Sequence, residues 1–199
     1  MPQGTISNQQ LDETDPVSAG YQTLVDAATQ YLGADGLARL HRAFEFGRDA
    51  HAGQRRDSGI PYFTHPIAVA SLLAEMKLDN DTLITALLHD TVEDCDVSLE
   101  ILAKAFGGDV AELVNGVTKL SQIELKSIDT KQAENFRKFV LAVGRDIRVL
   151  LVKLADRTHN MQTLGAVKKD ERRWRIANET MEIYAPLAER MGITRFQKE

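Results

Sequence analysis

The chain has 199 residues, 43% of them hydrophobic and 27% charged, which is enough for one domain with a sizeable core or for two small ones. Its net charge of −5 argues against a general nucleic-acid binder, because such proteins carry a basic face. No apolar run approaches the length of a membrane span, and the polar first residues do not resemble a secretory signal. The single cysteine, Cys95, fits a reducing compartment, so a cytoplasmic location is expected.

The N-terminal half of the chain predicts a tail followed by helices. Residues 1–19 are polar and contain two prolines, so they are expected to form a disordered or loosely docked tail before a single domain over 20–199. Helical patterns cover 21–31 and 37–52. The glycine-containing segment GQRRDSGIPYFTH then predicts a loop, and Pro66 suits the first position of the helix that follows.

The rest of the chain continues the helical pattern, so the fold class is predicted to be all-α. Asp79 or Asn80 is expected to cap the helix that contains TLITALL. Ser98 is expected to cap LEILAKAF, and Gly107 to close it. Further helices are expected over 109–120, 133–143, 147–164 and 171–191, with Pro186 kinking or breaking the last one. The polar residues 121–130 are expected to form a loop and are a candidate lid.

The stretch LLHDTVED places four ionisable side chains at the end of an apolar helix. His89 and Asp90 come first, and Glu93 and Asp94, here called the acidic pair, follow one helical turn after Asp90. Three carboxylates this close repel one another at neutral pH. A divalent cation would remove that conflict, so the stretch is a candidate metal site.

Two other segments offer further ligands. His65 ends the loop before Pro66, and Asp156 begins a polar stripe with Asn160 and Thr163 on an otherwise apolar helix. Histidines combined with carboxylates suit Mn²⁺, Fe²⁺ or Zn²⁺ better than Ca²⁺ or Mg²⁺. Such an ion activates water and polarises a phosphoryl oxygen, and the acidic pair would position that water or accept its proton.

Spacing alone makes a metal-dependent hydrolase plausible without establishing it, because simpler interpretations also fit. An adjacent His-Asp pair is common by chance, the acidic pair can be an exposed helix end, and the stripe from Asp156 can cap a neighbouring helix. His41, His51 and His159 are expected at the surface or behind the ligands. Nothing next to Cys95 suggests an activated nucleophile.

The chain resembles the hydrolase domain of the RelA/SpoT homologue family, the alarmone enzymes, which is an HD-domain phosphohydrolase. The resemblance extends from about Leu37 to the end. It is carried by RDSGIPYFTHPIAVASLLAEM, DTLITALLHDTVEDCDVSLEIL, FGGDVAELVNGVTKLSQIE, VLLVKLADRTHNMQTL and RIANETMEIYAPLAERMGI. It implies a helical bundle of the HD type, and it implies that the chain is the N-terminal part of a longer bifunctional protein with C-terminal synthetase and regulatory domains.

The resemblance also implies a reaction and a set of site residues. The reaction removes the 3′-pyrophosphate from guanosine 3′,5′-bis(diphosphate), or from the pentaphosphate form, and leaves GDP or GTP. The acidic pair would serve the attacking water. The implied ligands of one Mn²⁺ ion are His65, His89, Asp90 and Asp156, and the implied substrate contacts are Arg56 on the guanine base with Asn160 and Thr163 on the nucleoside.

One residue departs from the family pattern. Asp57 follows Arg56, where the family usually has lysine or arginine. An acid beside a tetra-anionic substrate is unfavourable, although Arg55 could compensate for it. A basic cluster could attract the diphosphates or could form a solvated helix face; its members are Lys168, Lys169, Arg172 and Arg173.

Two alternative functions therefore stay open. One is an HD-domain phosphatase of another specificity, such as a NADPH phosphatase or a 5′-nucleotidase. The other is a module that binds alarmone without cleaving it. The intact acidic pair, Glu93 and Asp94, counts against such a sensor, because binding alone does not need groups that activate water.

Overall fold

A computed structural model describes residues 15–126 and 146–193. Within these ranges the chain is helical, with no strand and one isolated bridge between Arg55 and Pro61, so the all-α prediction is confirmed. No helix in the described ranges is long and apolar enough to cross a membrane. The elements are α1 (Pro16–Thr29), α2 (Ala34–Ala50), α3 (Thr64–Glu75), α4 (Asn80–Leu88), α5 (Thr91–Asp94), α6 (Leu99–Phe106), α7 (Gly108–Lys126), α9 (Ile147–Gln162), the short turn η1 (Leu164–Ala166), α10 (Asp170–Glu179), η2 (Thr180–Tyr184) and α11 (Ala185–Arg190).

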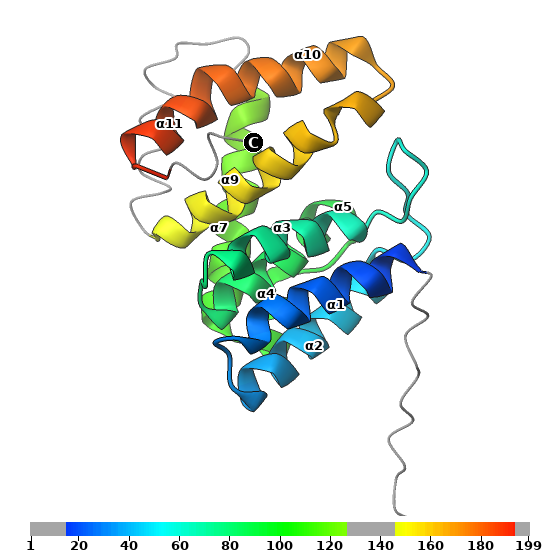
Figure 1. The fold of residues 1–199 in the computed structure, drawn as a ribbon, viewed down its shortest axis with the longest axis vertical. Coiled ribbons are helices and arrows are strands. Elements are labelled where there is room, and N and C mark those ends of the chain that lie inside the picture. Colours follow the sequence, from blue (N-terminus) through cyan, green and yellow to red (C-terminus); the bar gives the residue numbers. More distant parts are fainter. Residues whose placement is uncertain (1–14, 127–145, 194–199) are drawn as a thin grey trace, which may run out of the picture.

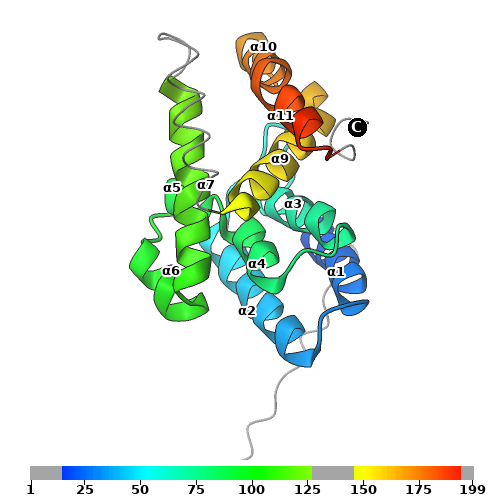
Figure 2. The same cartoon turned by 90° about the vertical axis from the view of Figure 1, so that its left-hand side faces the viewer.

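Helix α4 lies at the centre of the bundle. Every residue from Thr82 to Leu88 is buried, as expected for a helix that is covered on all sides. Helices α2, α3 and α7 pack against it, and α1 covers α3 (Figure 1). Figure 2 shows α6 and α7 along one side of α4, with α3 and then α1 on the other side. Helix α9 also contacts α3, α4 and α7, so the fold brings a helix from much later in the sequence against all three.

The predicted helix caps are confirmed. The Asp79 side chain accepts a hydrogen bond from the Thr82 amide at 3.2 Å. The Ser98 hydroxyl accepts one from the Ile101 amide at 3.3 Å. Gly107 ends α6 with a φ of 102°, a left-handed conformation that favours glycine. The caps on α4 and α6 follow from local hydrogen bonding, which explains why sequence alone located them.

Two predicted boundaries were wrong. Helix α1 begins at Pro16, so residues 16–19 are helical and do not belong to a tail. The Asp15 carboxylate accepts from the Ser18 amide at 3.1 Å, and Pro16 suits the first turn because its missing N–H has no helical partner there. Helix α7 continues to Lys126, so the first six residues of the candidate lid are helical. Residues 1–14, 127–130 and the helix expected over 133–143 lie outside the described residues.

The α-helical pattern is interrupted just before Pro186, where a kink or a break was expected, although the chain stays helical through it. Helix α10 ends at Glu179, a π-helical turn covers Thr180–Tyr184, and α11 begins at Ala185 with the proline in its first turn. The Ala185 amide bonds to the Thr180 carbonyl, five residues back. Proline has no amide hydrogen to continue an α-helical ladder, and the wider turn accommodates that loss.

A substitution at Gly47 is expected to destabilise the fold. A Cβ atom at this position in α2 would lie 2.5 Å from the buried Phe63 ring and 3.2 Å from the Leu87 carbonyl oxygen. Because neither neighbour can move freely, Gly47→Ala should lower the free energy of unfolding by about 1–3 kcal/mol. Urea denaturation followed by circular dichroism measures the change.

The matched control lies in the same helix. A Cβ atom at Gly36 would meet nothing closer than 3.5 Å, which is ordinary contact. Gly36→Ala should therefore leave the stability unchanged or raise it by up to about 1 kcal/mol, because alanine is the better helix former. Equal destabilisation by the two substitutions would contradict the packing argument.

Candidate metal centre

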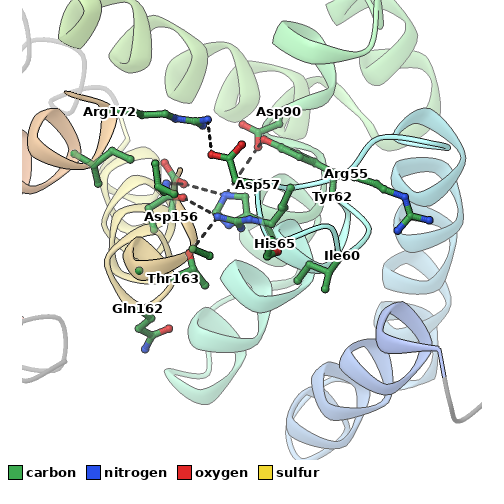
Figure 3. Close-up of a pocket in the computed structure, with 17 residues that line it drawn as sticks. Arg55, Asp57, Ile60, Tyr62, His65, Asp90, Asp156, Gln162, Thr163 and Arg172 are labelled. Atoms are coloured by element: carbon green, nitrogen blue, oxygen red, sulfur yellow. Dashed lines mark hydrogen bonds and ion pairs between the residues drawn. The ribbon is translucent and has the colours of Figure 1, made fainter. Parts of the chain in front are cut away.

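The four predicted ligands come from three separate segments of the chain and lie together. His65 is in the first turn of α3, His89 follows α4, Asp90 precedes α5, and Asp156 is on α9. The His65 Nε2 atom lies 3.1 Å from Asp156 Oδ1 and 4.0 Å from Asp90 Oδ2 (Figure 3). One potential ligand atom from each of three residues lies within 4.8 Å of the other two; these residues are His65, His89 and Asp156, and all three are buried.

His89 is oriented as a metal ligand would be. Its Nδ1 atom lies 2.8 Å from the Ala86 carbonyl oxygen, so Nδ1–H donates and Nε2 keeps a lone pair. That Nε2 atom is buried and makes no hydrogen bond within the described residues, although Asp90 Oδ1 is only 3.1 Å away. A buried polar atom without a partner is uncommon and costly. A cation between these side chains would supply the missing partner, so the donor set fits a divalent metal.

The carboxylate of Asp156 is held by a network on α9. Asn160 donates to Oδ1 at 2.7 Å, and the Lys153 ammonium lies 3.1 Å from Oδ2. Lys153 also donates to the Ser121 hydroxyl at 2.9 Å. Burial alone would raise the pKa of Asp156, but Lys153 and His65 hold that pKa well below its usual range. The Asp156 carboxylate is therefore ionised and held in a fixed orientation, as a metal ligand would be.

The helix does not run unbroken through LLHDTVED. Helix α4 ends at Leu88, His89 caps it, and α5 begins after Asp90. The Asp94 amide still bonds to the Asp90 carbonyl at 2.8 Å, so the expected one-turn spacing is kept. Partial burial, and then the negative charge of Asp90, raises the pKa of both Glu93 and Asp94. The acidic pair thus stands at the solvent-facing edge of the metal centre.

Tyr62 connects Asp94 of the acidic pair to Asp90, one of the candidate ligands. Its hydroxyl oxygen lies 2.7 Å from Asp90 Oδ2 (Figure 3) and 3.3 Å from Asp94 Oδ2. Burial and the charge of Asp90 raise the pKa of the Tyr62 hydroxyl, so it stays a neutral donor. One phenol therefore fixes the relative positions of a predicted ligand and a predicted water-activating group.

A pocket of about 470 Å³ opens from this centre. Asp90, Asp156 and His65 form part of its wall. Arg56 enters from the loop before α3, and its guanidinium donates to Asn160 Oδ1 at 3.3 Å and to Thr163 Oγ1 at 3.1 Å. The structure thus brings Asn160 and Thr163 into contact with Arg56, on the wall that also carries three of the candidate ligands.

Sequence reasoning missed two side chains of the site and did not foresee the exact place of a third. Lys153 stands three positions before Asp156 on the same helix, so the helical spacing argument could have found it. Tyr62 lies in the turn before α3, and only the fold brings it to Asp90. His159 lies behind His65, with 2.6 Å between their Nδ1 atoms. Burial, followed by His65 and Arg56, lowers the pKa of His159 to about 3, so its ring is neutral at physiological pH.

Asp57, the residue that departs from the family pattern, forms an ion pair in the pocket. Its Oδ2 atom lies 3.3 Å from Nη1 of Arg172, which comes from α10. Arg55, the residue expected to compensate, instead donates to the Gly59 carbonyl at 2.7 Å and points away from Asp57 (Figure 3). The compensating cation is therefore one member of the basic cluster that follows the Asp156 helix.

An all-helical bundle that gathers a distant histidine, a His-Asp pair and a distant aspartate has the organisation of an HD domain. The family model described as "HD domain" matches residues 43–194, so the chain belongs to the HD-domain family.

Particular relatives refine this assignment. The chain is 55% identical over 179 residues to "Guanosine-3′,5′-bis(diphosphate) 3′-pyrophosphohydrolase" of Vibrio cholerae, covering 90% of this chain and 25% of the relative. It is 52% identical, with the same coverage, to "Bifunctional (p)ppGpp synthase/hydrolase SpoT" of Escherichia coli. The chain thus spans about a quarter of the length of these relatives. The predicted resemblance to the HD domain of the RelA/SpoT family is confirmed.

A solved structure agrees with these relatives. It is described by the words "A metazoan ortholog of SpoT hydrolyzes ppGpp and plays a role in starvation responses", and its chain is 31% identical to this one. The TM-score is 0.54, and the match covers 72% of this chain and 79% of that chain.

Proposed function

We propose that this chain is a metal-dependent hydrolase that removes the 3′-pyrophosphate of guanosine 3′,5′-bis(diphosphate), or of the pentaphosphate, and leaves GDP or GTP. The observation that carries the proposal is the buried Nε2 of His89, which has no hydrogen-bond partner in the described part of the chain. It lies among three other candidate ligands, next to a nucleotide-sized pocket. The substrate is taken from the relatives and from the similar solved structure, which are named for their action on this nucleotide.

His65, His89, Asp90 and Asp156 would hold one Mn²⁺ ion. The mixed nitrogen and oxygen donor set supports this choice over Ca²⁺ or Mg²⁺. When bound, such an ion lowers the pKa of a coordinated water and polarises a phosphoryl oxygen. The side chains that flank the ligands then have two tasks, which are to orient the reacting groups and to handle the proton.

We propose that Glu93 and Asp94 handle that proton. The oxygen of water would form a bond to the phosphorus attached at O3′, and the bond from that phosphorus to O3′ would break. Glu93 would accept the proton of the water, and Asp94, held by Tyr62, would orient it. The proton ends on O3′ of the nucleotide, so the products are pyrophosphate and a free 3′-hydroxyl.

The nucleoside would lie along the wall formed by Arg56, Asn160 and Thr163. The planar guanidinium of Arg56, fixed by the other two side chains, offers a flat surface on which a guanine base can stack.

In the longer relatives this domain is a quarter of the protein, and we propose C-terminal synthetase and regulatory domains for the natural protein. Guanine nucleotides as substrate and products, together with the free Cys95, favour the cytoplasm as the location.

The test is the release of pyrophosphate from guanosine 3′,5′-bis(diphosphate) by the purified chain, with Mn²⁺ and with a chelator. Turnover is expected only with the metal, and Glu93→Gln is expected to lower kcat by about 10²–10⁴-fold. Parallel assays with NADPH and 5′-nucleotides test the alternative phosphatases. Turnover of those compounds in place of the guanosine bis(diphosphate) would overturn the proposal. Tight binding without turnover would indicate a sensing module.

A further inference from the structure

Three arginines line the described part of the pocket, and their partners differ. The guanidinium of Arg55 bonds to a carbonyl within its own loop. The guanidinium of Arg56 is engaged by Asn160 and Thr163. Arg172 reaches across from α10, and its partner is the carboxylate of Asp57. Among the described residues, Arg172 is thus the pocket arginine that is held by an anion and not by a neutral group of the site.

The substrate of the proposed function carries two diphosphates, and only one of them can lie at the metal centre. The 3′-diphosphate has to lie against Asp90 and Asp156, where its ester is cut. The 5′-diphosphate must then occupy another part of the same pocket and needs a cation there, because a diphosphate buried against uncompensated protein is unfavourable. Arg56 is already committed to the nucleoside wall, which leaves Arg172.

We infer that Arg172 binds the 5′-diphosphate and that Asp57 is its counter-ion before the nucleotide binds. This inference rests on the proposed function and assigns a subsite within it. The side chains of Arg172 and Asp57 are 55% and 38% exposed, and exposed ion pairs contribute little stability. Hydrogen bonds from a guanidinium to a phosphate are charge-assisted and can be bidentate, so a diphosphate competes well for Arg172.

The same exchange gives Asp57 a role in affinity. Once Arg172 turns to the diphosphate, the carboxylate of Asp57 remains beside an anion without its partner. Like charges at close range in a half-exposed site repel one another, which weakens binding. Asp57 therefore limits affinity for nucleotides with a 5′-diphosphate and has little effect on nucleotides without one.

The experiment compares two substrates, guanosine 3′,5′-bis(diphosphate) and guanosine 3′-diphosphate. For the first, Arg172→Gln should raise KM about tenfold, and Asp57→Asn should lower it about three- to tenfold. Neither variant should change KM for the second substrate by more than about twofold. Arg172→Lys, which keeps the charge, should restore part of the affinity.

Arg173→Gln is the matched control. It removes the same charge from the next position of α10, but Arg173 pairs with Asp170 on its own helix and does not line the pocket. No change in KM is expected for either substrate. Equal effects of Arg172→Gln on both substrates, or none on either, would overturn the inference.

A binding measurement separates this inference from the proposed function. Dissociation constants of both nucleotides, measured by calorimetry in a Glu93→Gln background with Mn²⁺, give the same comparison without turnover. If wild type does not hydrolyse the bis(diphosphate) and the two nucleotides still differ in their response to Arg172→Gln, the reaction assignment fails and the subsite holds. If neither nucleotide binds, the subsite fails too.

Discussion

Replacing His89 with alanine is expected to abolish metal-dependent turnover. The imidazole is buried, its Nδ1 is fixed by the Ala86 carbonyl, and its Nε2 has no hydrogen-bond partner within the described residues. Loss of a group that merely orients a ligand typically costs 10–100-fold in metal affinity, so loss of a ligand itself should cost at least about 100-fold. Calorimetric titration with Mn²⁺ measures that affinity directly.

The control for this prediction is His41→Ala. The side chain of His41 is 51% exposed and lies near Glu45, away from the candidate ligands, so Mn²⁺ affinity and turnover should be unchanged. Circular dichroism must show that His89→Ala keeps its helical content, and His89→Gln serves as a second variant that leaves a smaller cavity. Unchanged Mn²⁺ affinity in a folded His89 variant would contradict the ligand assignment.

The sequence predicts those parts of the site that depend on local patterns. His89 and Asp90 are visible because they follow an apolar helix, and the Asp90–Asp94 spacing survives the break after Leu88 because one helical turn remains. Asp156 and Asn160 are visible because polar residues on a buried helix need partners, and the 2.7 Å hydrogen bond between them bears this out. The same local rules located the caps at Asp79 and Ser98.

The sequence could not predict contacts between distant segments. The pairing of Asp57 with Arg172 joins residues 115 positions apart, and only the fold brings α10 to the loop before α3. The place of His159 behind His65 likewise depends on how α9 packs against α3. The start of α1 was missed for another reason. Asp15 and Pro16 are typical both of a loop and of a helix start, and packing of Tyr21 and Leu24 into the core decides between them.

Tyr62→Phe is expected to lower kcat strongly while leaving KM nearly unchanged. The phenol touches Asp90 and Asp94, which would position the metal and the attacking water, so its loss should disturb the reacting groups more than substrate binding. A fall in kcat of about 10–100-fold, with weaker Mn²⁺ binding in the same range, is expected for a group that orients a ligand. Steady-state kinetics and Mn²⁺ titration provide the two measurements.

Tyr31→Phe provides the comparison that isolates the role of the hydroxyl. The Tyr31 hydroxyl is also buried but has no hydrogen-bond partner within the described residues, and it lies in the turn between α1 and α2. Its removal should change neither kcat nor Mn²⁺ affinity. If Tyr62→Phe raised KM and left kcat intact, the phenol would be a substrate contact. If it changed stability alone, the link between Asp90 and Asp94 would be structural, and the orientation of the acidic pair would have to come from the backbone of α5.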